Sequence, residues 1–147
     1  MKIEYCGNII EIDAEKTAEF SKALPVVTDE CNCPGCRNYV QAIGVFPSVV
    51  KELFKGLGID LRKASEVYVY SSVGKGDAVY YGGFYHLCGK LLKAEPDADV
   101  SYKITDGYSV RFIKEIDLAE GVIPDDAVQM EIAFTSVPWV LSEENPY

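Results

Sequence analysis

Hydrophobic and polar residues alternate with a period of two along most of the second half of the chain. The runs with this pattern begin at Glu66 and read EVYVYSSV, AVYYGGFYHLCGKLL, VSYKI, YSVRFIKEI and VQMEIAF. Clusters of glycine, proline and aspartate separate the runs, as expected of turns between strands. The pattern predicts an antiparallel meander of about five strands.

The turn before Tyr108 predicts how two of these strands pair. A three-residue loop over residues 105–107, with Gly107 in the left-handed conformation, would pair Tyr102 with Val110. A two-residue loop would shift the register by one and reverse the faces of one strand. We expect the three-residue loop.

The start of the chain, residues 2–13, predicts an N-terminal β-hairpin. A two-residue loop at Gly7-Asn8 would pair Ile3 with Ile12 and gather the isoleucines on one face. A short helix with a thin apolar face is expected after the hairpin, before the first proline of the chain.

Two linked helices are predicted between the hairpin region and the strands. Pro34 suits the first helical position, which makes Cys33 the N-cap of the first helix and places Cys36 and Val40 on one face. The second helix is expected from about residue 47 to residue 57. Its inward-facing residues are expected to be Val49, Val50, Leu53, Phe54 and Leu57.

These elements predict a single α+β domain over residues 1–147. It would combine an antiparallel meander sheet of about five strands, two linked helices packed on one face, and the N-terminal β-hairpin. The length of 147 residues suits one hydrophobic core. A hydrophobic fraction of 48% and a mean hydropathy of +0.02 are typical of a globular protein rather than a disordered one.

The charge of the chain bears on its partners and its compartment. A formal net charge of −9 repels phosphate backbones and anionic lipids, so no nucleic acid and no membrane is expected as a partner. The first residues, MKIEYCGNIIEID, carry acids where a signal peptide has its apolar segment. We expect a cytoplasmic protein, and its 5 cysteines are an odd number that argues against a complete set of disulfides.

The stretch CNCPGC at residues 31–36 is the strongest candidate for chemistry, and one hypothesis is a metal site. Zinc is typically held by four ligands, and Cys31, Cys33 and Cys36 offer three thiolates. His86 and Cys88 could supply the fourth ligand, because residues i and i+2 of a strand point to the same face.

Two other interpretations of the cysteines remain open. Cys33-Pro-Gly-Cys36 is a Cys-x-x-Cys at a helix N-terminus, where a thiolate is favoured, and a thiol-redox centre is the second hypothesis. Its Pro-Gly order is the reverse of the thioredoxin one, and no strand leads directly into it. The plainest interpretation is that Cys36 packs in the core, while Cys31 and Cys33 are inert loop thiols and no cofactor is bound.

The aromatic run AVYYGGFYHLC predicts a central strand with both faces apolar. Its glycines, Gly82 and Gly83, are expected to accept neighbouring aromatic rings, in preference to lining a ligand pocket. His86 is the only histidine of the chain, and an enzyme built around it is the hypothesis with the least support, since the sequence has no nucleophile elbow to accompany it.

Four segments resemble a family of small uncharacterised bacterial proteins with no established activity. They are CPGCRNYV (33–40), GLGIDLRKASEVYVY (56–70), YYGGFYHLCG (80–89) and VPWVL (137–141). The resemblance implies a one-domain architecture and a recurrent unit of Cys33, Cys36, Arg37 and Asn38. In that unit, Arg37 and Asn38 would reach loop carbonyls or acids and fix the entry of the helix.

The leading functional hypothesis is a non-enzymatic protein-interaction module, similar to an inhibitor or immunity protein. Tyr80, Tyr85 and Trp139 are the expected contact residues, because tyrosine and tryptophan anchor many interfaces. The alternative is a zinc-binding or thiol-redox protein that uses the cysteine cluster. The sequence does not identify the protein partner.

Overall fold

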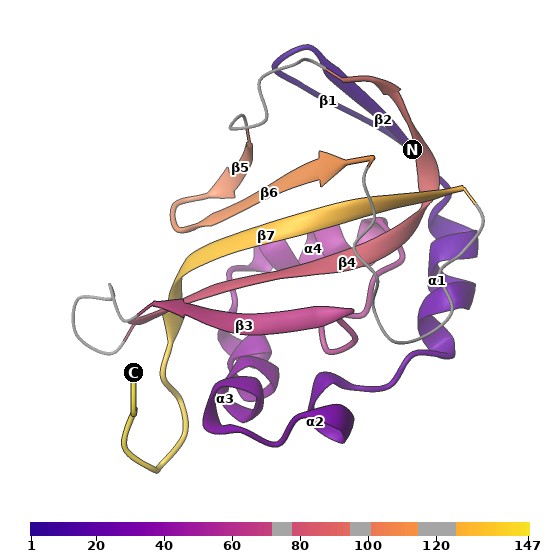
Figure 1. The fold of residues 1–147 in the computed structure, drawn as a ribbon. Coiled ribbons are helices and arrows are strands. Elements are labelled where there is room, and N and C mark those ends of the chain that lie inside the picture. The colour runs from indigo at the N-terminus through magenta and orange to yellow at the C-terminus, as the bar shows by residue number, and fades with distance from the viewer. Residues whose placement is uncertain (72–77, 95–100, 115–125) are drawn as a thin grey trace.

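The structure, a computed structural model, describes residues 1–71, 78–94, 101–114 and 126–147 (Figure 1). The strands are β1 (Lys2–Tyr5), β2 (Asn8–Ile12), β3 (Glu66–Ser71), β4 (Ala78–Lys93), β5 (Tyr102–Thr105), β6 (Tyr108–Ile113) and β7 (Ala127–Pro138). The helices are α1 (Ala14–Lys22), α2 (Val27–Glu30), α3 (Pro34–Ala42) and α4 (Ser48–Gly56), with a 3-10 turn at Ile43–Val45. The predicted α+β class is confirmed.

Strand β4 is the centre of the sheet. The strand order is β1-β2-β4-β7-β6-β5, and β3 also pairs with β4. Strand β7 follows one edge of β4 from Ala78 to Cys88. On the opposite edge, β3 pairs with residues 80–84 and β2 with residues 89–93. All of these pairings are antiparallel.

The sheet is larger than the predicted meander of about five strands, and its strand order departs from a meander. All five predicted strands are present, but the N-terminal hairpin joins them, which gives a seven-stranded sheet among the described residues. Strand β7 lies between β4 and β6, so β4 does not pair with β5. A strand inside a sheet has a hydrogen-bonded neighbour on each edge, and alternation along the sequence does not name that neighbour.

The N-terminal hairpin forms with a different register. Its turn is Cys6-Gly7, with positive φ angles of 46° and 83°, as a type I′ turn requires. Ile3 therefore pairs with Ile10 instead of Ile12. The shift is two residues, so the predicted faces are kept, and Ile10 and Ile12 are buried in the core.

The predicted turn at Gly107 is confirmed in the conformation of its glycine and in one residue pair, but it has two residues, Asp106 and Gly107, instead of the expected three. Gly107 has a φ of 82°, and Tyr102 pairs with Val110. Strand β5 has an irregularity between Lys103 and Thr105, so Thr105 takes the place opposite Tyr108.

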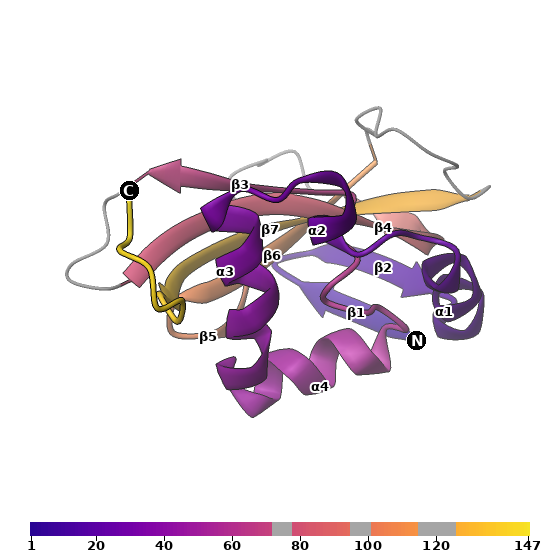
Figure 2. The ribbon, with the colours of Figure 1, turned by 90° about the horizontal axis from the view of Figure 1, so that it is seen from below.

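The two linked helices pack on one face of the sheet, as predicted (Figure 2). Helix α3 begins at Pro34 with Cys33 as its N-cap. The expected inward faces are largely confirmed, since Val50, Phe54 and Leu57 are buried. The exceptions are Val40, which is only half-buried, and Val49, which is 45% exposed, whereas Asn38 and Tyr39 are buried. Polar Asn38 takes a core position because its amide is hydrogen-bonded there.

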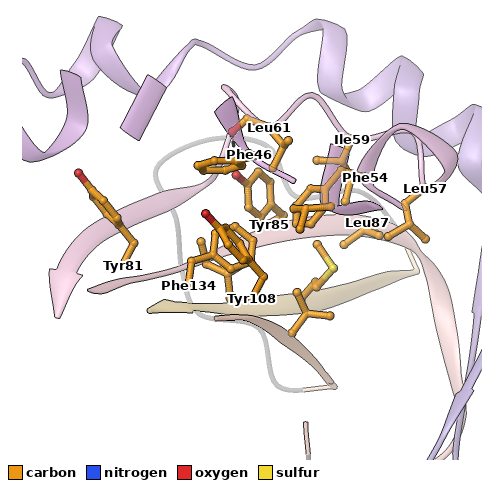
Figure 3. Packing of buried hydrophobic residues seen from close by; sticks show 14 of the residues in the cluster. Phe46, Phe54, Leu57, Ile59, Leu61, Tyr81, Tyr85, Leu87, Tyr108 and Phe134 are labelled. Atoms are coloured by element: carbon orange, nitrogen blue, oxygen red, sulfur yellow. Dashed lines mark hydrogen bonds between the residues drawn. The ribbon is translucent and has the colours of Figure 1, made fainter. Parts of the chain in front are cut away.

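The core between helices and sheet is rich in aromatic rings (Figure 3). Phe46 and Phe54 point from the helical layer onto Phe134 of β7, with ring centroids 5.8 and 6.1 Å apart. Phe54 also packs edge-on against Tyr85 at 5.3 Å. Such aromatic pairs add stability beyond the area they bury.

Candidate metal centre

The cysteine cluster lies where the chain enters α3. Helix α2 ends at Glu30, Cys31 follows in an extended conformation, and Cys33 caps α3. The Cys33 Sγ accepts the backbone N–H of Cys36 at 3.4 Å, so a sulfur does what a serine or aspartate oxygen does at most helix N-caps. The loop and the helix start thus turn the three cysteines toward one another.

The three sulfur atoms form one group. All three Sγ atoms lie within 4.8 Å of one another, and the Cys31 thiol donates to the Cys33 Sγ at 3.3 Å. Cys31 is exposed, Cys33 is half-buried and Cys36 is 5% exposed. The prediction that Cys36 is buried is confirmed, and the same residue also belongs to the cluster.

The surroundings shift the pKa values of Cys33 and Cys36 in opposite directions. For Cys33, burial acts to raise the pKa, but the hydrogen bonds from the Cys36 backbone and from Cys31 outweigh it and lower the pKa. For Cys36, burial raises the pKa, and its hydrogen bonds with Cys31 and Cys33 raise it further. Of these two thiols, Cys33 therefore ionises more readily.

Arg37 fixes the loop that carries the cysteines. Its Nε donates to the Asn32 carbonyl at 3.2 Å, and its guanidinium forms an ion pair with Glu143. The hydrogen bond to Glu143 raises the pKa of Arg37, and the nearby Cys33 adds to the effect. The predicted role of Arg37 in fixing the helix entry is confirmed, and the side chain also brings a positive charge close to Cys33.

Asn38 attaches the end of β7 to α3. Its side chain is 0% exposed and donates to the Tyr81 hydroxyl at 3.2 Å and to the Pro138 carbonyl at 3.1 Å. Its carbonyl oxygen accepts the Val140 N–H at 2.7 Å. Asn38 was expected to reach a loop carbonyl, and the carbonyl that it reaches belongs to Pro138, the last residue of β7. These contacts hold the segment 139–147 over the start of α3.

Tyr147 completes the frame of the cluster. Its hydroxyl accepts the Gly35 N–H at 3.2 Å, and the phenol lies beside the Cys33 thiol. The Gly35 carbonyl accepts the Tyr81 hydroxyl at 2.7 Å. A Cβ at Gly35 would lie 2.9 Å from a Val69 methyl, so only glycine fits here without a shift. The sequence carried no signal for Tyr147, because 112 residues separate it from Gly35.

His86 and Cys88 are not brought to the cluster, which corrects the predicted set of five ligands. His86 lies against Ser65 and Gln129, with Nδ1 2.8 Å from Ser65 Oγ and Nε2 3.1 Å from Gln129 Oε1. Cys88 is buried beside α1, where its backbone N–H donates to Thr17 Oγ1 at 3.1 Å. Among the described residues, only the three clustered cysteines form a group that could hold a metal ion. Two residues on one strand face need not point at a given loop, so the spacing alone could not locate the fourth ligand.

The predicted contact residues have different environments. Tyr85 is 2% exposed and donates to the Leu61 carbonyl at 2.7 Å, so it belongs to the core and its prediction as a contact residue is wrong. Tyr80 is half-buried against Tyr70, and the Trp139 indole donates to the Glu143 carbonyl. An interaction role for Tyr80 and Trp139 stays a prediction.

Two exposed tyrosines of β3 lie near Tyr80. The strand was predicted from the sequence, but its tyrosines were not among the expected contact residues. Tyr68 and Tyr70 are 43% and 64% exposed. The Tyr68 ring covers Gly82, where a Cβ would lie 2.5 Å from it. The prediction that a glycine of β4 accepts an aromatic ring is confirmed for Gly82, while Gly83 instead meets the backbone of β3.

The sequence matches no family model, and it has no match among the curated proteins or the solved structures that were compared with it. The resemblance to small bacterial proteins therefore stays a prediction. No helix in the described part of the chain has the length and apolar character needed to cross a membrane.

Proposed function

We propose that this chain is a metal-thiolate protein that binds one zinc ion through Cys31, Cys33 and Cys36. The convergence of the three Sγ atoms within 4.8 Å carries the proposal. In a tetrahedral site with Zn–S bonds of about 2.3 Å, neighbouring sulfurs lie about 3.8 Å apart. Small side-chain rotations would bring the three sulfurs to that spacing.

The electrostatics of the cluster support a thiolate ligand set. Zinc binds cysteine as the thiolate, so a site gains affinity when its surroundings favour deprotonation. The Cys36 N–H and the Arg37 guanidinium both lie where they stabilise negative charge on Cys33. Loss of such an outer contact typically lowers metal affinity by about 10- to 100-fold.

The packing supports a metal site on which the fold itself does not depend. The core cluster is built from aliphatic and aromatic residues of the sheet and helices and contains none of the three cysteines. Zinc prefers a fourth ligand, which solvent, a substrate or a partner would supply to an open site. A three-thiolate site at an exposed loop is suited to exchanging its fourth ligand.

Elemental analysis of the purified, untagged protein tests the proposal. We expect about one zinc ion per chain, lost in Cys33→Ser and retained in Cys6→Ser. Cys6 is the matched control, because it is an exposed cysteine in the Cys6-Gly7 turn. Zinc-free protein that also fails to take up added zinc under reducing conditions, or equal zinc in both variants, would refute the proposal.

A further inference from the structure

We propose that the same cluster, when free of metal, carries out thiol–disulfide exchange, with Cys33 as the attacking thiol and Cys31 as the resolving thiol. The activity goes beyond metal binding, because it needs two of the three cysteines and no ion. Its substrate class is an accessible disulfide, such as a small-molecule disulfide or an exposed one on another protein.

The position of Cys33 suits attack on a disulfide from solvent. Its Sγ sits at the N-terminus of α3 and accepts the Cys36 N–H at 3.4 Å. That contact and the positive end of the helix dipole both stabilise the negative sulfur that must attack. Cys33 is half-buried, so its sulfur is held in place and still meets solvent.

The geometry favours Cys31 over Cys36 as the resolving thiol. The Cys31 Sγ lies 3.3 Å from the Cys33 Sγ. Cys31 is exposed on the loop before the helix and can move toward Cys33 without disturbing α3. Cys36 is 5% exposed and fixed in the first turn of α3, with its backbone already bonded to Cys33. The expected product is therefore a Cys31–Cys33 disulfide, although Cys33-Pro-Gly-Cys36 has the familiar Cys-x-x-Cys spacing.

The exchange takes two balanced steps. The Cys33 thiolate attacks one sulfur of the substrate disulfide, the substrate S–S bond breaks, and the first substrate thiolate leaves and takes a proton from water. The Cys31 thiol loses its proton to solvent, and its sulfur attacks the Cys33 Sγ, which breaks the mixed disulfide and releases the second substrate thiolate. Two electrons pass from the cysteine pair to the substrate, and a thiol reductant reverses the reaction.

Oxidised glutathione provides the test, applied to the full chain after chelation and removal of metal. The wild type is expected to form an internal disulfide that peptide mapping assigns to Cys31–Cys33. In Cys31→Ser, a glutathione adduct should accumulate on Cys33 at least about tenfold faster than on Cys6, which is the exposed reference thiol within the same chain. Cys33→Ser should lose both products.

Cys36→Ser separates this proposal from the zinc proposal. Zinc binding uses three thiolates, so the variant should lose zinc, whereas exchange uses two and the Cys31–Cys33 disulfide should still form. An internal disulfide that maps to Cys33–Cys36, or a Cys33 that reacts no faster than Cys6, would overturn the exchange proposal. Should Cys36→Ser fail to fold, the peptide map of the wild type alone decides between the two cysteine pairs.

Discussion

Replacing Asn38 by alanine should destabilise the protein much more than removing an exposed amide would. The Asn38 side chain is 0% exposed and makes hydrogen bonds to Tyr81, Pro138 and Val140. Each such bond contributes about 1 kcal/mol net, and partners left buried without a bond add a desolvation penalty. We therefore expect the free energy of unfolding to fall by about 3 kcal/mol, which for 147 residues lowers Tm by about 10 °C.

Chemical denaturation and thermal unfolding by circular dichroism measure the effect. Gln41→Ala is the matched control, because it removes an exposed amide from the same helix and should change stability by less than about 0.5 kcal/mol. Since Asn38 holds Val140, the segment with Glu143 and Tyr147 should also loosen, and zinc affinity should fall about tenfold or more. If Asn38→Ala and Gln41→Ala have equal stability, the reasoning about this network is refuted.

Three further predictions follow from other contacts. Gly58→Ala should lower the free energy of unfolding by about 3 kcal/mol, because Gly58 has a φ of +81° and a Cβ there would lie 2.2 Å from the Ala14 carbonyl oxygen. The control Gly44→Ala, in open space, should be neutral or slightly stabilising. Equal denaturation midpoints for the two variants would contradict this. Burial raises the pKa of Tyr39, Tyr81 and Tyr85 above the ordinary value of 10.0. Their contribution to stability is therefore complete below pH 10.0 and is lost as the pH rises further, by about 1.4 kcal/mol per pH unit for each phenol. Denaturant titrations at several alkaline pH values measure this loss, and a stability that does not change with pH would contradict it. Chelating bound zinc should lower Tm, because a ligand that binds only the folded state stabilises it. The far-UV circular dichroism should stay unchanged, because the core cluster is built without the three cysteines. Loss of the helical signal on chelation would contradict this.

Local features of the fold could be predicted from the sequence where one residue has a narrow conformational choice. Within a helix, proline is tolerated only in the first turn, so Pro34 begins α3 and Cys33 is found at the N-cap as expected. Gly107 supplies the left-handed residue of its turn, and the pairing of Tyr102 with Val110 follows. In both cases the physical constraint acts within a few residues of its cause.

Strand order could not be predicted, because it depends on contacts between distant segments. Alternation identified β4 and β7 as strands, but nothing in their patterns says that Gly83 of β4 lies opposite Ile132 of β7. The register of the N-terminal hairpin, like the strand order, did not follow from the alternation of residues. Two registers gave the same buried face, and the backbone angles of Cys6 and Gly7 decided between them.

The candidate site could be predicted in its local part only. The spacing of Cys31, Cys33 and Cys36 within one short loop makes their convergence a local property, and the structure bears it out. His86 was matched to the cluster by its chemistry, yet its ring is held by Ser65 and Gln129. Tyr147 was missed for the opposite reason, since a single phenol far along the chain gives no sign of the helix it will cover.

The central place of β4 has a consequence for synthesis of the chain. Strand β7, which pairs with one edge of β4 from Ala78 to Cys88, comes later in the sequence than any other strand that the structure describes. As the ribosome releases the chain from its N-terminus, β4 must therefore wait with that edge open and its buried residues exposed. During this interval the nascent chain presents an unpaired apolar strand, which is the kind of segment that chaperones recognise and that mispairs with other copies.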